Sequence, residues 1–282
     1  MNIKGSTNIV GLIGHPVEHS FSPPMHNAAF EALGMDYAYV AFDVNSSNLK
    51  TAIEGARALN IKGFNVTIPH KIEVMQYLDE LDEIAELIGA VNTIDFKNLK
   101  GYNTDGIGAI RAIEEVSTVK NKDVVVAGAG GASRAISFYL AKFGANSITI
   151  LNRNVDKARS LASDISDSDL INEVKADSIS NISSYLNDSQ ILVDTTPLGM
   201  HPHVDDEPIA AADDMHEDLV VFDAVYNPNE TVLLKQAIKA GAKPVYGIKM
   251  LLYQGVESFK IWTGRDAPVD VMENALNEYL GR

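Results

Sequence analysis

One segment constrains the fold more than any other, the run DVVVAGAGGASRAISFYLAKFGA at residues 123–145. A short β-branched strand leads into a glycine turn, and a helix with apolar periodicity follows the turn. Gly128, Gly130 and Gly131 occupy the turn, with Ser133 where a third glycine would complete the pattern G-x-G-x-x-G. Backbone amides in such a turn converge with a helix N-terminus on a pyrophosphate. The segment predicts a Rossmann-type dinucleotide site, although a tight turn without a ligand has the same local pattern.

The residues after the next strand, SITILNR, indicate which dinucleotide is bound. A carboxylate at this position usually binds a free ribose 2′-hydroxyl, whereas a 2′-phosphate needs cations. The chain has Asn152 and Arg153 here, with Lys157 one helical turn later. A guanidinium can pair with phosphate and stack on adenine. We therefore predict NADP rather than NAD, although Asp156 lies among these residues and both cations could be ordinary surface charges.

The rest of the chain alternates strand-like and helix-like segments, which is typical of βα units in a mostly parallel sheet. The predicted strands of the first third are residues 9–13, 37–42, 61–68 and 91–96. The alternation restarts at Asp123, and an apolar-periodic helix covers residues 247–262. We predict an α/β chain of two domains: residues 106–246 form a doubly wound dinucleotide-binding domain, and residues 1–105 with the returning C-terminal helices, 247–282, form the other.

Composition excludes several classes of protein. Lys and Arg number 23 against 38 Asp and Glu, a net charge of −15, and so acidic a surface repels nucleic acid. There is no cysteine, hence no disulfide or thiolate ligand. No stretch approaches the roughly 18 apolar residues of a membrane span, and the N-terminus lacks a signal-peptide pattern. We expect a cytoplasmic protein, without a metal site because His15, His19 and His26 are irregularly spaced.

The segment GFNVTIPHK predicts a strand with two different faces. Its period of two places Phe64, Val66 and Ile68 toward the core. Asn65 and Thr67 would then line a surface at the carboxyl end of the strand, where parallel sheets bind ligands, with Lys71 just beyond. A solvent-facing strand followed by an unrelated lysine has the same spacing.

Two further polar positions are typical of helix caps. Ser22 precedes Pro23 and Pro24 and is predicted to cap the first helix, which Gly34 can end. Asp105 follows the turn in GYNTDGIG and has the position of a cap for the next helix. Residues 163–188 are rich in Ser, Asp and Asn and are predicted to be solvated helix surface and loop.

Taken together, these segments resemble the shikimate dehydrogenase family. The matching motifs follow the family's order along nearly the whole chain: GHPVEHSFSPPMHN, NVTIPHK, GAVNT, GYNTDGIG, GAGGASR, NRN, TTPLGM and YGIKMLLYQG. The resemblance implies an NADP-dependent oxidoreductase that interconverts shikimate and 3-dehydroshikimate, a reaction of chorismate and aromatic amino acid biosynthesis.

The resemblance also implies roles for individual residues. Lys71 and Asp105 would be the catalytic pair. The implied substrate site comprises Ser20, Ser22, Asn65, Thr67, Asn92, Asp105, Tyr226 and Gln254. The implied cofactor site comprises Gly128, Ala129, Gly130, Gly131, Ala132, Asn152, Arg153, Asn154, Lys157, Thr196, Ala224 and Gly247. Asn154 stands where NADP-strict members often have Ser or Thr, and Lys157 where some have Arg, so NAD could be used as well.

Three other functions have to be weighed. A relative that uses NAD and accepts quinate would differ by a few pocket contacts. A non-catalytic NADP-binding sensor would have no use for a proton-transferring pair such as Lys71 and Asp105. A dinucleotide-dependent oxidoreductase of another pathway would leave Ser20, Asn65 and Asn92 unexplained. The sensor would bind NADP and a cyclohexene acid in order to regulate a partner. For the enzyme we predict small-molecule partners and neither nucleic acid nor membrane, and the sequence does not distinguish a monomer from a homodimer.

Overall fold

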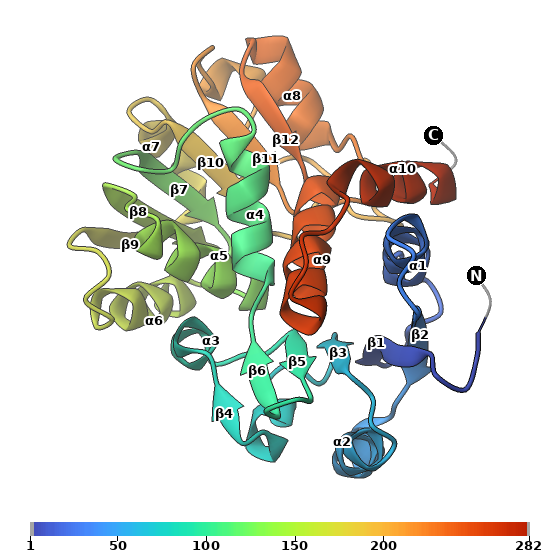
Figure 1. The fold of residues 1–282 in the computed structure, drawn as a ribbon. Coiled ribbons are helices and arrows are strands. Elements are labelled where there is room, and N and C mark those ends of the chain that lie inside the picture. The colour runs from blue at the N-terminus through green and yellow to red at the C-terminus, as the bar shows by residue number, and fades with distance from the viewer. Residues whose placement is uncertain (1–2, 281–282) are drawn as a thin grey trace. The chain divides into compact units, whose positions relative to one another are not determined.

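The computed structural model describes residues 3–280 (Figure 1). The chain divides into two compact units: one contains the residues up to Thr104 together with those from Gln254 onward, and the other is Asp105–Tyr253. The second cut falls inside helix α9 (Gly247–Thr263), so this helix contributes residues to both units. The helix itself is the one expected at residues 247–262.

The first unit is built on a six-stranded sheet of order β2-β1-β3-β5-β6-β4. Its strands are β1 (Asn8–Gly14), β2 (Tyr37–Asp43), β3 (Gly63–Val66), β4 (Glu80–Leu81), β5 (Thr93–Asp95) and β6 (Lys100–Tyr102). Its helices, besides the end of α9, are α1 (Ser22–Ala32), α2 (Leu49–Ala58), α3 (Glu83–Ile88), α10 (Val269–Tyr279) and the 3-10 segments η1 (Ser46–Asn48) and η2 (Glu73–Tyr77). Strand β1 pairs in parallel with β2 and β3, while β5 is antiparallel to both of its neighbours.

Helix α1 begins differently from the prediction. Phe21 is the N-cap and makes no side-chain capping bond, while Ser22 is the first helical residue and is buried. The prediction that Ser22 caps the helix is therefore wrong; instead the Ser22 amide donates to Ser20 Oγ at 3.2 Å. Gly34 follows the helix with a positive φ of 60°, as a helix-terminating glycine does.

Strand β3 is shorter than expected. Phe64 and Val66 are 3% and 2% exposed and pack in the core of this unit, together with Ile13 and Ile94. The predicted inward position of Ile68 is wrong, because its side chain is 73% exposed. The strand ends at Val66, so the alternation of faces no longer holds two residues later.

The second unit has the doubly wound Rossmann arrangement. Its strands are all parallel, in the order β12-β11-β10-β7-β8-β9. They are β7 (Asp123–Ala127), β8 (Ser147–Asn152), β9 (Val174–Ser178), β10 (Ile191–Asp194), β11 (Val220–Asp223) and β12 (Lys243–Tyr246). The helices, besides the start of α9, are α4 (Asp105–Glu114), α5 (Gly131–Lys142), α6 (Val155–Ser166), α7 (Ile182–Leu186), α8 (Val232–Ala240) and the 3-10 segments η3 (Ile179–Asn181) and η4 (Ala212–Asp214). Figure 1 shows α6 beside β9 and α8 beside β12.

The prediction of helix surface and loop over residues 163–188 missed a strand. This stretch contains the end of α6, the edge strand β9 and the short helix α7. Apart from the exposed Lys175, the residues of β9 are only partly buried. An edge strand of this kind, VKADS, lacks the apolar alternation that would reveal it.

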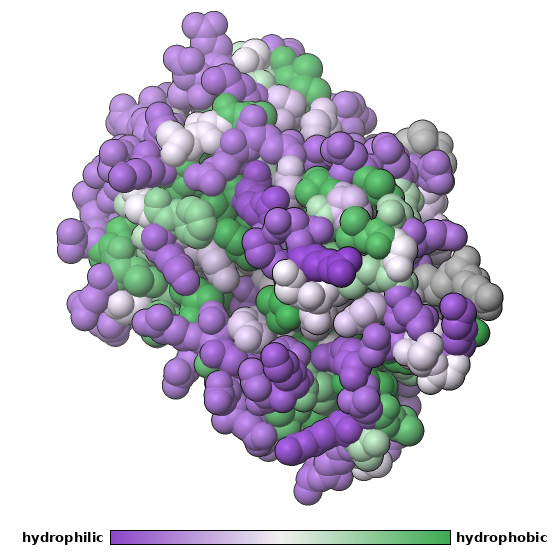
Figure 2. Space-filling model, in the orientation of Figure 1, coloured by the Kyte–Doolittle hydropathy of each residue, from purple (hydrophilic) through white to green (hydrophobic). Residues whose placement is uncertain are grey.

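Hydrophilic residues cover most of the face shown in Figure 2, and apolar side chains occur among them in small groups. Among residues 3–280, none of the helices has the length and apolar character needed to cross a membrane.

Candidate functional site

A buried polar cluster occupies the first unit where β3 and β5 pair. Asn65 on β3 and Thr93 on β5 are register partners. The Asn65 amide nitrogen donates to Thr93 Oγ1 at 3.0 Å, to Ser258 Oγ at 2.9 Å and to the Asn92 carbonyl at 3.3 Å. Its oxygen accepts from the Tyr39 hydroxyl at 2.8 Å. Both amide hydrogens of Asn65 are therefore engaged inside the protein.

Asn92 connects this cluster to the chain that enters α4. Its Oδ1 accepts from the Thr104 amide at 2.7 Å, and its Nδ2 donates to Thr104 Oγ1 at 3.0 Å. Thr104 is only 3% exposed and immediately precedes Asp105, the first residue of α4. The cluster thus holds the backbone directly before the carboxylate that is predicted to be catalytic.

Lys71 is held beside the same cluster through its backbone. The Val91 amide donates to the Lys71 carbonyl at 2.8 Å, one residue before Asn92. The buried His70 side chain contacts the Val44 carbonyl through Nε2 at 2.6 Å. Lys71 itself is partly exposed, as is Thr67. The segment after β3 therefore has a defined path beside Asn92.

Tyr39 links two of the predicted substrate residues. It is 3% exposed, and burial raises the pKa of its hydroxyl above the ordinary range, while a hydrogen bond with Ser22 opposes that shift. The same hydroxyl donates to Asn65. Asn65 and Asn92 thus belong to one hydrogen-bonded group with Tyr39, and Ser22 lies close enough to influence the pKa of the Tyr39 hydroxyl.

Several members of this group are not among the residues predicted from the sequence. They are Tyr39, Thr93, Thr104 and Ser258. Ser258 lies one helical turn after Gln254 and donates to its carbonyl at 2.9 Å. Two signals in the sequence could have indicated these residues. Ser258 lies one helical turn from a predicted site residue, and Thr93 and Thr104 lie inside the motifs GAVNT and GYNTDGIG.

Tyr226 belongs to the second unit, where it follows β11 and is 38% exposed.

The glycine turn of the second unit has the geometry of a phosphate-binding loop. Gly128 has a φ of 107°, and a Cβ there would lie 2.3 Å from Thr195 Oγ1, so the position requires glycine. No atom lies within 4 Å of the Cβ positions of Gly130 and Gly131, so the turn leaves room for a ligand to approach the backbone. Helix α5 begins at Gly131, and its first amides have no partner within the helix. These features fit the pyrophosphate of a dinucleotide.

Ser133 replaces the third glycine of the pattern without disturbing this turn. It is fully buried, and its hydroxyl donates to the Gly128 carbonyl at 2.7 Å. The hydroxyl thereby joins the first turn of α5 to the glycine turn.

We expect Ser133→Ala to lower the free energy of unfolding by about 1–2 kcal/mol, because the buried Gly128 carbonyl loses its donor. Urea denaturation followed by circular dichroism measures the loss. Ser137→Ala is the matched control, because Ser137 is also fully buried on α5 but its hydroxyl has no hydrogen-bond partner. An equal loss in both variants would contradict the role given to the Ser133 hydroxyl.

The predicted 2′-phosphate site lies between β8 and α6. Arg153 and Lys157 are exposed there, and Asn152 Nδ2 donates to the Asn154 carbonyl at 3.0 Å. Asn154 caps α6, because its Oδ1 accepts from the amides of Asp156 and Lys157. The Asp156 carboxylate pairs with Arg159 at 3.1 Å. Asp156, the acidic residue among the predicted cations, therefore has a cationic partner further along α6.

The remaining predicted cofactor residues follow three neighbouring strands. Thr196 comes after β10, Ala224 directly after β11 and Gly247 directly after β12. A Cβ on Gly247 would lie 2.6 Å from the Ala224 carbonyl, so this close approach needs glycine. The three positions share the carboxyl edge of the sheet with the glycine turn, the edge at which doubly wound sheets bind ligands.

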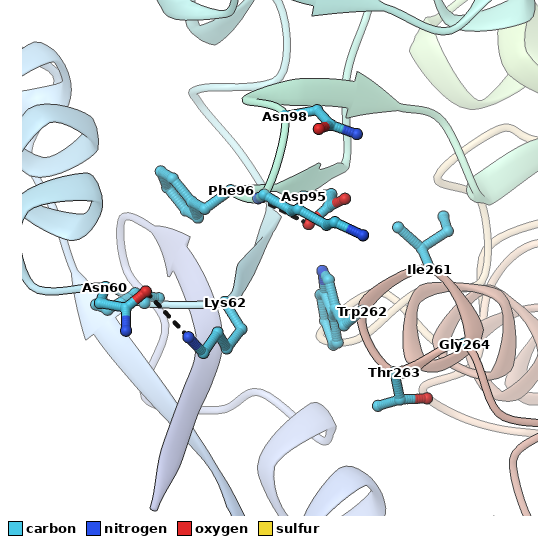
Figure 3. A pocket seen from close by; sticks show the side chains of 11 residues that line it. Asn60, Lys62, Asp95, Phe96, Asn98, Ile261, Trp262, Thr263 and Gly264 are labelled. Carbon is cyan, nitrogen blue, oxygen red and sulfur yellow. Dashed lines mark hydrogen bonds between the residues drawn. The ribbon is translucent and has the colours of Figure 1, made fainter. Parts of the chain in front are cut away.

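A cavity of about 500 Å³ lies elsewhere in the first unit (Figure 3). Its lining includes Lys62 and Asp95 beside the Trp262 ring. Lys62 donates to Asn60 at 3.0 Å, and the Trp262 indole donates to the Ile94 carbonyl at 3.0 Å. Lys62 precedes β3, so the cavity lies at the end of that strand opposite to Thr67 and Lys71. None of the predicted site residues lines it.

The three histidines near the N-terminus have separate surroundings. His26 is fully buried and stacks on Tyr39 with 4.5 Å between ring centroids, and burial lowers its pKa to about 3. His15 Nδ1 lies 2.6 Å from Asp43 Oδ1. Over residues 3–280, His, Cys, Asp and Glu nowhere form a group of three that could hold a metal ion.

Comparison with known proteins gives matches over most of the chain. Residues 12–94 match the family described as shikimate dehydrogenase substrate binding domain, residues 111–230 the family shikimate / quinate 5-dehydrogenase, and residues 247–276 the shikimate 5'-dehydrogenase C-terminal domain. A shikimate dehydrogenase (NADP(+)) of Methanobrevibacter smithii is 71% identical over 278 residues, which are 99% of each chain.

Solved structures agree with these matches. A shikimate dehydrogenase crystallised with NADP+ has 51% identity and a TM-score of 0.93, covering 100% of this chain and 98% of its own. The shikimate 5-dehydrogenase of Listeria monocytogenes, crystallised with shikimate and NAD, has 36% identity and a TM-score of 0.93, covering 98% of both chains.

Proposed function

The chain belongs to the shikimate dehydrogenase family, and on that basis we propose that it catalyses reversible hydride transfer between shikimate and NADP+, which yields 3-dehydroshikimate and NADPH. One observation supports this most directly. The buried cluster of Asn65, Asn92 and Thr104 adjoins the Lys71 segment and ends at Asp105, which unites motifs from distant parts of the sequence.

The proposed reaction needs a proton acceptor. When the alcohol carbon of shikimate loses hydride, its hydroxyl must lose a proton as the ketone forms. We assign the transfer of that proton to the Lys71 amine, with the Asp105 carboxylate orienting the amine and the hydroxyl. In the reverse direction the same ammonium returns the proton to the carbonyl oxygen.

The cofactor supplies the hydride acceptor when it is bound. The glycine turn, Gly128–Ala132, would bind the pyrophosphate through its amides, and Arg153 and Lys157 the 2′-phosphate. Thr196, Ala224 and Gly247 would lie along the nicotinamide half, because they follow the three strands next to that turn.

The residues of the proposed substrate site have different roles. Ser20 and Ser22 would hold the carboxylate of shikimate, and Thr67, Asn92 and Asp105 its ring hydroxyls, with Tyr226 and Gln254 completing the site. Asn65 acts differently in our proposal. Both of its amide hydrogens are engaged with the cluster, so it orients Thr93 and Ser258. Its oxygen already accepts from the Tyr39 hydroxyl, which leaves one acceptor position for a ligand.

A direct assay tests the proposal. Purified protein is mixed with shikimate and NADP+, and the absorbance of reduced nicotinamide is followed, with quinate and NAD+ as separate arms. We expect the highest kcat/KM for the pair shikimate and NADP+. A higher kcat/KM for quinate with NAD+ would favour the quinate-using alternative, and no turnover with any pair would contradict the proposal.

The cellular location and the assembly remain predictions. We expect a cytoplasmic enzyme that is a monomer or a homodimer and binds only small molecules. Size-exclusion chromatography with light scattering decides between monomer and homodimer, and cell fractionation tests the location.

A further inference from the structure

Two carboxylates are buried side by side in the second unit. Asp194 is the last residue of β10 and Asp223 the last of β11, and they are 1% and 0% exposed. They are register partners on neighbouring parallel strands, so their side chains leave the same face of the sheet from backbones about 4.8 Å apart. Two buried like charges at this spacing cannot both be ionised at moderate cost.

The hydrogen bonds around the two carboxylates differ. Asp223 accepts at both oxygens, from the Val225 amide at 2.9 Å and the Thr231 hydroxyl at 2.6 Å. Thr231 is the N-cap of α8, where the helix dipole favours an anion. Among the described residues, Asp194 accepts at Oδ1 from the Thr196 amide at 2.8 Å, and the Thr196 side chain also acts to lower its pKa. Asp223 is thus placed as the anion, and Asp194 Oδ2 is the oxygen left to carry a proton.

Among the described residues, no strand or helix next to the two carboxylates places a cationic side chain beside them. Strand β7 places Ala127 beside Asp194, and β12 places Tyr246 beside Asp223. The lysines of α8, Lys235 and Lys239, are exposed. Burial raises the pKa of both carboxyls, and the charge of Asp223 raises that of Asp194 further.

We propose that Asp194 and Asp223 share one proton, which Asp194 carries and donates to Asp223, and that this bond positions the loops that bind the nicotinamide half of the cofactor. The inference rests on the proposed placement of that half at Thr196, Ala224 and Gly247. The Thr196 amide donates a hydrogen bond to the Asp194 carboxylate, and the Ala224 amide donates to the Asp194 backbone carbonyl at 2.9 Å. The two aspartates are positioning residues and do not touch substrate.

Loss of the shared proton at alkaline pH should weaken the contacts to the nicotinamide half of NADPH and leave the contacts to its adenosine half unchanged. NADPH affinity is measured by fluorescence titration from about pH 7 to about pH 9, a range in which the phosphate is mostly in its doubly charged form. We expect the wild-type Kd for NADPH to rise about tenfold across this range. The Kd for adenosine 2′,5′-bisphosphate, which lacks nicotinamide, should change less than about twofold because its contacts lie near Arg153.

The conservative variant Asp194→Asn tests the proton itself. An amide donates to Asp223 at every pH, so its Kd for NADPH should stay within about twofold of the neutral wild-type value over the whole range. Asp223→Asn provides a second variant in case the first does not fold. Asp213→Asn, which removes an exposed carboxylate of η4 in the same unit, should retain the wild-type pH dependence.

Thermal unfolding gives a second readout that involves no ligand. A carboxyl with a raised pKa binds more protons in the folded than in the unfolded state, so stability falls as pH rises from the ordinary carboxyl range to the raised pKa. The wild-type Tm should therefore fall by about 5 °C relative to that of Asp194→Asn between about pH 5 and about pH 9.

Two outcomes would overturn the proposal. Parallel Tm profiles for wild type and Asp194→Asn would mean that no proton is shared. Equal pH effects on NADPH and adenosine 2′,5′-bisphosphate would mean that the pair does not act on the nicotinamide half. Neither measurement uses shikimate, so both report on the aspartate pair alone. A failure of the proposed reaction would instead appear as an absence of turnover in the assay with shikimate and NADP+.

Discussion

Lys71→Ala is expected to lower kcat for shikimate oxidation by about 10²–10⁴-fold, the usual contribution of a positioned proton-transferring group. The NADPH affinity should be unchanged, because Lys71 is assigned to the substrate hydroxyl and to none of the cofactor contacts. Steady-state kinetics and fluorescence titration of NADPH measure the two quantities separately.

Two comparison variants distinguish a role of Lys71 in proton transfer from an effect of its positive charge. Lys71→Arg keeps the positive charge, but a guanidinium does not give up its proton in a protein, so the loss of kcat should persist. Lys97→Ala removes an exposed lysine of the same unit and should leave kcat within about twofold. Near-normal turnover by either Lys71 variant would show that another group moves the proton.

Arg153→Ala is expected to raise the Kd for NADPH by about 10- to 100-fold, because a charge-assisted contact with the 2′-phosphate contributes on the order of 1.5–3 kcal/mol. The Kd for NADH, which lacks that phosphate, should change little. Arg159→Ala is the matched control, since Arg159 is an exposed arginine of α6 that pairs with Asp156. Equal weakening of NADPH and NADH by Arg153→Ala would refute the assignment.

The dinucleotide-binding half of the fold could be predicted because its signals are local. The strand, glycine turn and helix at residues 123–145 lie within one βα unit, and the structure has β7, the turn and α5 there. Gly128 shows why the pattern is informative, since its positive φ and its contact with Thr195 both exclude a side chain. The positive φ belongs to the turn itself and is signalled by the sequence, whereas the contact with Thr195 is tertiary and is known only from the structure.

The buried polar cluster could be predicted only in part, because tertiary contacts assemble it. Asn65 and Ser258 are 193 positions apart, and nothing near either residue indicates the other. The family resemblance supplied Asn65 and Asn92, but not Thr93, Thr104 or Ser258. Thr93 and Thr104 meet because β5 pairs with β6 in a hairpin, and only the first of these strands was predicted, at residues 91–96.

The errors at Ile68 and Ser22 have a common physical origin. In both places the end of an element was misplaced by one or two residues. Strand alternation was extended two residues beyond Val66, and the cap of α1 was placed one residue too late. Boundaries depend on competing hydrogen bonds, such as that between the Ser22 amide and Ser20 Oγ, which patterns of hydrophobicity do not record.

The bond between Ser133 and Gly128 has a practical consequence for recognising nucleotide-binding chains. The third glycine of the pattern allows the helix to approach the strand closely, and here a small hydroxyl side chain achieves the same approach by bonding to the turn it faces. A search that insists on glycine at that place would pass over chains of this design. Admitting serine, on condition that a β-branched strand precedes the turn, would recover them.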